Sequence, residues 1–82
     1  MPKTILLADH STTIHRLVSL ALAGEDVKVE TVQDGASAIE AIEERTPDLV
    51  IADVALQMPT AWDIAAYVRA HVNLESMPVL LL

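Results

Sequence analysis

The sequence predicts a small α/β domain built on a parallel β-sheet. Short apolar runs of strand length alternate with segments of helical periodicity along the 82 residues. Two of these runs, residues 4–8 and 49–52, are apolar almost throughout, as strands buried on both faces are. The order is strand then helix three times, followed by a final strand. This order implies right-handed crossovers and helices on the faces of the sheet.

The first strand, residues 4–8, is followed by hydroxyl groups at residues 11–13 that can cap a helix, and Gly24 can end it. The apolar side chains of this helix recur every three or four residues. They form one stripe: Ile14, Leu17, Val18, Ala21 and Leu22. Residues 27–32 alternate between apolar and polar side chains, which predicts a strand with one exposed face at a sheet edge.

A turn at Asp34 and Gly35 leads into a second helix over residues 36–45. Pro47 ends that helix, because proline disfavours helical geometry in the residue before it. Residues 49–52 then form the second strand that is apolar throughout.

Residues 54–60 contain Pro59 and predict a loop before a third helix. The apolar stripe of that helix is Ala61, Ile64, Ala65, Val68 and Val72. A fourth apolar strand, residues 79–82, has nothing behind it to cover its outer edge, and such an edge invites pairing with another chain. We therefore expect either a longer protein or missing elements supplied from elsewhere. We also expect the isolated chain to self-associate or exchange segments.

The composition excludes several classes of protein. Five basic and twelve acidic residues give a net charge of −7, so we expect this segment to bind neither nucleic acid nor membrane. No apolar run approaches the roughly 20 residues of a membrane span, and the N-terminus lacks the apolar core of a signal peptide. The absence of cysteine excludes disulfide scaffolds and thiolate metal sites and fits a cytoplasmic protein.

Two aspartates predict where the chemistry takes place. Asp9 and Asp53 each follow an apolar strand, and these strands are natural neighbours at the centre of an open parallel sheet. Two carboxylates this close repel each other unless a cation is present. Mg²⁺ fits, because it binds carboxylate oxygens together with a phosphate. The pair therefore indicates phosphoryl chemistry, with one aspartate as nucleophile or metal ligand.

Several stretches of the sequence resemble the receiver domain of two-component response regulators. They are residues 5–11 (ILLADHS), 13–17 (TIHRL), 33–36 (QDGA), 38–39 (AI), 47–54 (PDLVIADV) and 77–82 (MPVLLL). The resemblance covers the whole chain without gaps. It implies a flavodoxin-like, doubly wound parallel sheet with strand order 2-1-3-4-5. Residues 1–82 would be its N-terminal two-thirds, with order 2-1-3-4 and an incomplete C-terminal end.

The resemblance also implies residue roles. Asp53 matches the phosphoacceptor, whose carboxylate attacks a phosphohistidine and becomes an acyl phosphate, with Mg²⁺ offsetting the phosphoryl charge. Asp9 matches the first of the family's two acidic residues after strand one. Ala55 matches the position whose backbone carbonyl binds the metal. The alternative for both aspartates is an ordinary turn or helix-capping role.

Departures from the family pattern affect the cation site. His10 stands where the family has its second acid, and imidazole suits Zn²⁺, Ni²⁺ or Cu²⁺ better than Mg²⁺, so we expect weak Mg²⁺ binding. Other interpretations of His10 are a solvated or ion-paired neighbour of Asp9, or a pH-sensitive element. Gln57 replaces a family proline, proline occurs at Pro59 instead, and the glycine expected near Ala61 is absent. We therefore expect a differently shaped loop.

We expect a regulatory module and not an enzyme. A histidine kinase would phosphorylate Asp53, and contacts with an output domain or downstream protein would change. The family's phosphoryl-holding Thr or Ser and its Lys would lie after Leu82. The alternative is a pseudo-receiver, a phosphorylation-independent interaction or dimerisation module, which His10 and the altered loop favour. A nucleotide-binding domain is opposed by the lack of a glycine-rich loop, since the chain has only two glycines.

The sequence also predicts the surroundings of three further residues. We expect His15 and His71 to lie on solvated helix faces. Trp62, at the start of the third helix, is expected to pack in the core or at its rim, or to contact a partner.

Overall fold

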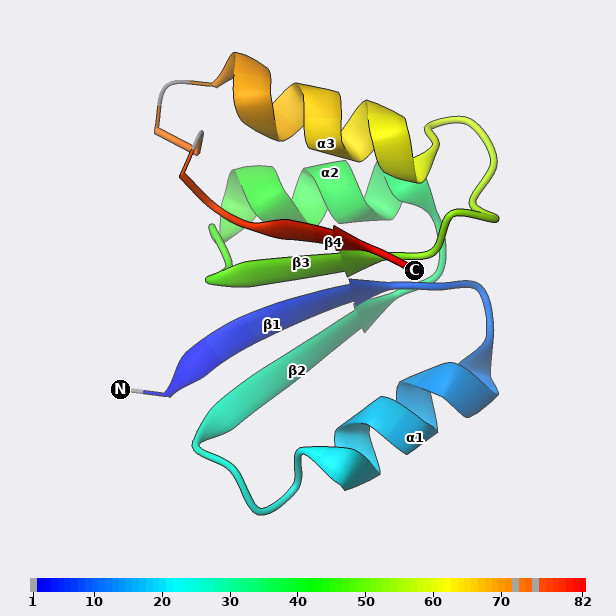
Figure 1. The fold of residues 1–82 in the computed structure, drawn as a ribbon, viewed down its shortest axis with the longest axis vertical. Helices are drawn as coiled ribbons and strands as arrows, with labels where there is room; N and C mark the ends of the chain where they lie inside the picture. The colour runs from blue at the N-terminus through cyan, green and yellow to red at the C-terminus, as the bar shows by residue number, and fades with distance from the viewer. Residues whose placement is uncertain (1, 72, 75) are drawn as a thin grey trace.

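Four parallel strands form one sheet in the order β2-β1-β3-β4 (Figure 1). The computed structural model describes residues 2–71, 73–74 and 76–82. The strands are β1 (Lys3–Ala8), β2 (Val27–Val32), β3 (Leu49–Ala52) and β4 (Val79–Leu81). The helices are α1 (Thr12–Ala21), α2 (Gly35–Glu44) and α3 (Ala61–Ala70). The predicted parallel sheet, its strand order and the alternation of strands and helices are confirmed.

The boundaries differ from the predicted ones by a residue or so. β1 begins at Lys3, and α2 begins at Gly35, which the sequence places in the turn before it. β4 ends at Leu81, one residue earlier than expected. Val72, the last member of the predicted third stripe, lies outside the described residues.

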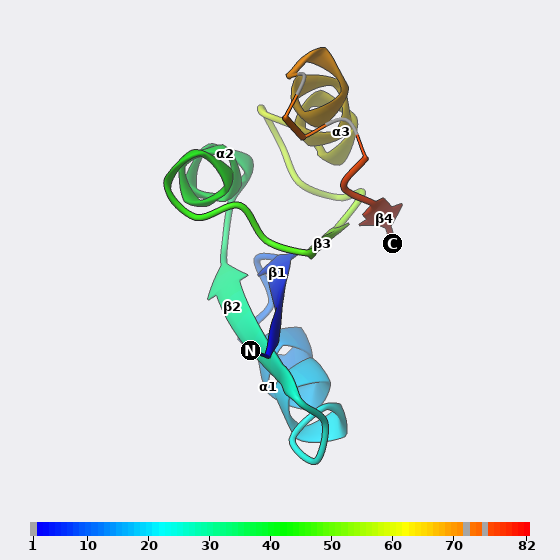
Figure 2. The ribbon, with the colours of Figure 1, turned by 90° about the vertical axis from the view of Figure 1, so that its left-hand side faces the viewer.

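The helices divide between the two faces of the sheet (Figure 2). α2 and α3 lie over one face, and α1 lies on the other. The main core fills the α2–α3 face, because alternate residues of each strand point to the same side. The core members with 2% exposure or less are Leu6, Ala8, Ala38, Ile42, Val50, Ala52, Ala61, Ile64 and Val68. Leu7, between two of them in sequence, is buried against the opposite face.

The face that carries α1 is only partly covered. None of the ten residues of α1 is buried, and Leu17 and Leu20 are 56% and 66% exposed. α1 lies beside β1 and β2 and away from β4 (Figures 1 and 2), and Leu80 of β4 is 48% exposed. Apolar side chains on both α1 and β4 are therefore open to solvent.

Side-chain caps determine where the helices begin. The Ser11 hydroxyl accepts a hydrogen bond from a backbone amide of α1, in agreement with the predicted cap. Asp34 accepts one from the Ser37 amide at 2.7 Å. At α3, the Thr60 side chain accepts from the Asp63 amide and the Asp63 carboxylate from the Thr60 amide, which forms a capping box. In the described part of the chain, no helix has both the length and the apolarity to cross a membrane.

Candidate functional site

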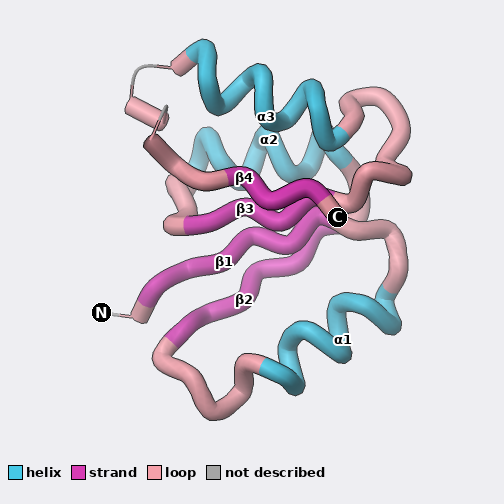
Figure 3. Tube along the Cα trace, viewed as in Figure 1, coloured by secondary structure: helices cyan, strands magenta, loops and turns pink. Residues whose placement is uncertain are grey.

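The carboxyl ends of all four strands lie at the same end of the sheet (Figure 3), and the two central strands carry aspartates there. Asp9 follows β1 and Asp53 follows β3. The residues before them, Ala8 and Ala52, are register partners and fully buried. The Asp53 amide donates a hydrogen bond to the Ala8 carbonyl at 2.9 Å. The core and the strand ladder therefore hold the two aspartates side by side.

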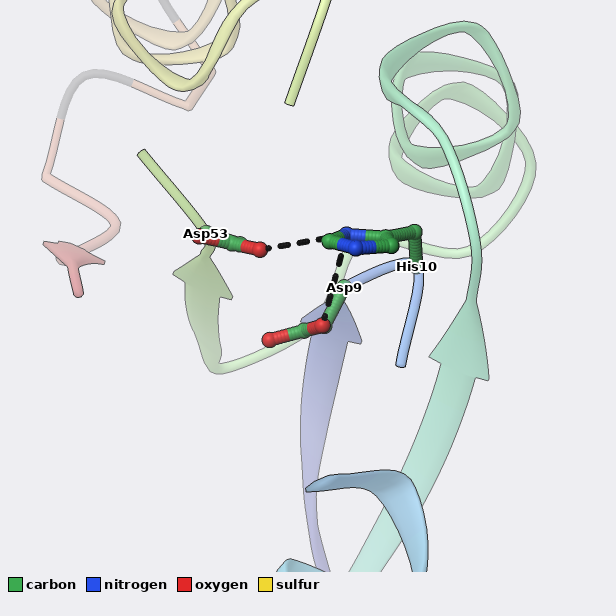
Figure 4. A group of neighbouring side chains, drawn as sticks. All are labelled: Asp9, His10 and Asp53. Atoms are coloured by element: carbon green, nitrogen blue, oxygen red, sulfur yellow. Dashed lines mark ion pairs between the residues drawn. The ribbon is translucent and has the colours of Figure 1, made fainter. Parts of the chain in front are cut away.

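His10 faces both carboxylates (Figure 4). Its Nδ1 atom is 3.4 Å from Asp53 Oδ2 and 3.9 Å from Asp9 Oδ1. One donor atom from each of the three side chains lies within 4.8 Å of the other two. The carboxylate side chains are only 14% and 16% exposed for Asp9 and Asp53, whereas the imidazole is 69% exposed. The two acids therefore form the inner part of the site and His10 the solvent side.

Backbone amides orient both carboxylates. Asp9 Oδ1 accepts a hydrogen bond from the Ser11 amide at 2.8 Å, and Asp53 Oδ1 accepts one from the Ala55 amide at 2.9 Å. In both cases the donor lies two residues further along the chain. The bond to Ala55 limits rotation of the Asp53 carboxylate, whose Oδ2 atom faces His10. Chemically, the cluster offers one oriented nucleophilic oxygen together with carboxylate and imidazole ligands for a divalent cation.

The sequence points to Ala55 only through its carbonyl, and the structure adds a contact of its amide. Ala55 lies in the exposed loop after β3, where its N–H orients Asp53. A surface hollow of about 430 Å³ adjoins this segment and the imidazole. It is lined by His10, Gln33, Asp34, Ala55, Leu56, Gln57 and Met58. Met58 is 85% exposed at its rim, and the Met58–Pro59 peptide bond is cis.

The loop between β3 and α3 packs against the start of α2. A Cβ atom added to Gly35 would lie 2.1 Å from the Pro59 carbonyl oxygen and 2.9 Å from its carbonyl carbon. Only glycine fits there without a backbone shift. Sequence reasoning missed this contact, because it assigned Gly35 to a local turn and the contact joins residues far apart in the chain.

The other two histidines differ in their surroundings. His71 caps α3 and is exposed, as expected, with Nδ1 2.6 Å from the Tyr67 carbonyl oxygen. The expectation of a solvated His15 is wrong. It is half-buried, and its Nε2 is shielded from solvent without a hydrogen-bond partner among residues 2–71, 73–74 and 76–82. His15 shares the half-buried side of α1 with Val18, one turn further along the helix. Trp62 is 60% exposed, so the expectation that it could pack in the core is wrong.

Comparison with known proteins places the chain among signalling proteins. Residues 5–82 match the family model described as the response regulator receiver domain. The chain is 37% identical over 81 residues to the probable transcriptional regulatory protein TcrX of Mycobacterium tuberculosis, covering 99% of this chain and 34% of that protein. It is 28% identical over 82 residues to the DNA-binding response regulator MtrA of the same organism, covering 100% and 35%. The chain thus spans about a third of the length of these relatives.

Solved structures give the same result. A putative response regulator from Chloroflexus aurantiacus superposes with a TM-score of 0.91 at 28% identity, covering 99% of this chain and 66% of that one. The chemotaxis response regulator CheY4 of Vibrio cholerae gives a TM-score of 0.90 at 27% identity, covering 99% and 68%. These neighbours share the flavodoxin-like receiver fold, with the strand order observed here. The chain therefore belongs to the family of response-regulator receiver domains of two-component systems.

Proposed function

We propose that this chain is a phosphorylation-dependent switch in which Asp53 takes a phosphoryl group from a histidine kinase. The change at Asp53 would then alter contacts with an output domain or a downstream protein. The observation that carries the proposal is the position of Asp53 at the carboxyl end of a central strand, beside Asp9 and oriented by the Ala55 amide. Membership of a regulatory family agrees with this role.

In the proposed reaction, a carboxylate oxygen of Asp53 attacks the phosphorus of a phosphohistidine. A P–O bond forms and the P–N bond breaks, with its electron pair remaining on the departing imidazole nitrogen. The product is an acyl phosphate, for which a carboxylate is a well-precedented nucleophile. The hydrogen bond from the Ala55 amide to Oδ1 fixes the orientation of the attacking carboxylate.

Asp9, Asp53 and the backbone carbonyl of Ala55 are the groups that would hold Mg²⁺. When bound, such an ion offsets negative charge on the phosphoryl oxygens. The two clustered carboxylates fit a hard cation, but the imidazole that faces them does not. We therefore propose that Mg²⁺ binds weakly at this site.

We propose that residues 1–82 are the N-terminal two-thirds of a receiver domain in a cytoplasmic regulator. The solved neighbours support this, since the chain covers only about two-thirds of them. We propose a DNA-binding output, because a relative about three times as long is named a DNA-binding response regulator. The net charge of −7 argues against contact of this segment itself with nucleic acid or membrane.

A second candidate function is that of a pseudo-receiver, a phosphorylation-independent interaction or dimerisation module. It is favoured by the imidazole of His10, which lies 3.4 Å from Asp53 Oδ2 and can pair with the carboxylate that phosphorylation requires. The exposed Leu17 and Leu80 suit an apolar contact surface. On this basis, we propose that the isolated chain self-associates or exchanges segments, with β4 as the pairing edge.

Phosphorylation of the full-length protein decides between the two functions. The protein is incubated with acetyl phosphate, or with a phosphorylated histidine kinase, at saturating Mg²⁺ and analysed by mass spectrometry. We expect one acyl phosphate, on Asp53, and its loss in Asp53→Asn, because an amide is a poor nucleophile. Asp26→Asn is the matched control, since Asp26 is exposed before β2, outside the site. No label on Asp53 with any donor would favour the pseudo-receiver.

A further inference from the structure

We propose that Asp9, His10 and Asp53 form a site that prefers a borderline transition-metal ion, represented by Zn²⁺, over Mg²⁺. The inference rests on the proposed function in one respect, because it names the cation of the same site, but it requires no phosphoryl transfer. Its basis is the disagreement between the donor atoms that the structure brings together and those that a hard cation prefers (Figure 4).

The spacing of the donor atoms suits a four-coordinate ion. With metal–ligand bonds of about 2.0–2.2 Å, two ligands of a tetrahedral Zn²⁺ ion are roughly 3.3–3.5 Å apart. The 3.4 Å between His10 Nδ1 and Asp53 Oδ2 already meets this requirement. The 3.9 Å between His10 Nδ1 and Asp9 Oδ1 must shorten, by about 0.5 Å on the same bond lengths. The imidazole can make that adjustment, because its side chain is largely exposed.

The types of donor atom separate the two ions. Mg²⁺ requires near-octahedral coordination by oxygen and usually keeps several waters. Imidazole nitrogen suits zinc, nickel and copper, and sites with nitrogen and oxygen ligands bind these ions more strongly than the hard cations. His10 therefore adds a nitrogen ligand that favours Zn²⁺, at a position where a carboxylate would favour Mg²⁺.

The two carboxylates are already oriented for such an ion. The Ser11 and Ala55 amides each donate to one carboxylate oxygen, and hydrogen bonds of this kind hold metal ligands in place. An ionised carboxylate has about four lone-pair sites, so one amide bond leaves capacity for a metal. Three protein ligands leave a fourth position for water or a phosphoryl oxygen, as in open zinc sites.

The test is a metal titration of the full-length protein without a phosphodonor. Protein stripped of metal with a chelator, which is then removed, is titrated calorimetrically with Zn²⁺ and, separately, with Mg²⁺. The variants are His10→Ala, which removes the nitrogen ligand, and His10→Asp, which makes the site all-oxygen. His71→Ala is the matched control, because it removes an exposed histidine at the end of α3, outside the site. Co²⁺ in place of Zn²⁺ adds a spectroscopic readout, since tetrahedral Co²⁺ absorbs visible light far more strongly than octahedral Co²⁺.

We expect the wild-type protein to bind Zn²⁺ at least about 100-fold more tightly than Mg²⁺. His10→Ala should weaken Zn²⁺ binding about 10- to 100-fold and remove the intense Co²⁺ bands. His10→Asp should weaken Zn²⁺ binding and strengthen Mg²⁺ binding about tenfold. His71→Ala should bind both ions like the wild type, and circular dichroism spectra should show that every variant is folded.

Two results would overturn the inference: equal Zn²⁺ affinity in wild type and His10→Ala, or a wild-type preference for Mg²⁺. Its failure is distinguishable from failure of the proposed function. Mg²⁺-dependent labelling of Asp53 without a preference for Zn²⁺ rejects the metal inference alone. A His10-dependent Zn²⁺ site in a protein that never becomes labelled rejects the switch alone.

Discussion

Replacing Gly35 with alanine tests whether the loop after β3 is braced against the start of α2. The added Cβ atom would lie 2.1 Å from the Pro59 carbonyl oxygen and 2.9 Å from the carbonyl carbon. Both contacts are with backbone atoms, which cannot rotate away as the end of a flexible side chain can. Either the loop or the first turn of α2 must therefore move.

The expected cost follows from overpacking. Inserting a methyl group into a tightly packed site costs about 1–3 kcal/mol. The better helix propensity of alanine returns less than about 1 kcal/mol, since Gly35 is only the first residue of α2. For a domain of this size, each kcal/mol shifts the melting temperature by about 4–8 °C. We therefore expect Gly35→Ala to melt roughly 5–20 °C below the wild type.

Thermal and urea unfolding followed by circular dichroism measure this effect. The matched control is Gly24→Ala, because apart from the two adjoining residues no described atom lies within 4 Å of a Cβ at Gly24. That control should be neutral, or stabilising by up to about 1 kcal/mol through the unfolded state. If Gly35→Ala unfolded at the same temperature as Gly24→Ala, the contact between the loop and α2 would be refuted.

Three further predictions concern the core, a helix cap and the open face. Ile42→Ala should lower the free energy of unfolding by about 2–5 kcal/mol, because Ile42 is 1% exposed in the core. A loss below about 1 kcal/mol, measured by urea denaturation, would contradict the close packing of Ile42 in the core. The hydrogen bond from the Ser37 amide lowers the pKa of Asp34. The ionised cap therefore stabilises the fold fully at pH values above the ordinary carboxyl pKa, and this stabilisation is lost as the pH falls through the lowered pKa. Asp34→Asn should flatten this part of a plot of melting temperature against pH, and an unchanged profile would exclude the cap as its source. Leu80→Lys should reduce self-association of the isolated chain, measured by light scattering. Ala66→Lys makes the same charge change at an exposed site on α3 and should leave self-association unchanged. Equal association of the two variants would exclude the open sheet face around Leu80 as the contact surface.

The sheet is predictable because its signal is local. Residues 49–52 are apolar without exception, and the structure makes them a central strand with Val50 and Ala52 fully buried. The alternation at residues 27–32 marks β2 as an edge strand, where the structure places it. The order of the strands depends on long-range pairing, and it followed from the family resemblance and not from periodicity. The clustering of Asp9 and Asp53 did not need the full order, because it was expected from the general rule that ligand sites of open parallel sheets lie at the carboxyl ends of neighbouring central strands.

Other features depend on packing between distant residues. Two different groups of residues on α1 have the spacing that would place them together on one side of the helix. Only contact with the sheet decides which of the two groups faces inward. The structure half-buries His15, Val18 and Leu22 and leaves Leu17 exposed, so apolarity alone predicts the inner side poorly. Similarly, the sequence identifies His10 as a departure from the family, but only coordinates show that its Nδ1 atom faces both carboxylates.

The site joins residues with very different freedom to change. Asp9 and Asp53 directly follow two fully buried alanines, so any shift of their backbone disturbs the centre of the sheet. The His10 side chain is 69% exposed and contributes nothing to the core. Substitution at position 10 therefore alters the chemistry of the cluster at little cost in folding free energy. The fold holds two of the three candidate ligands in place and leaves the third free to be substituted, so in the proposed metal site a single substitution at position 10 would alter the preferred cation without a new scaffold.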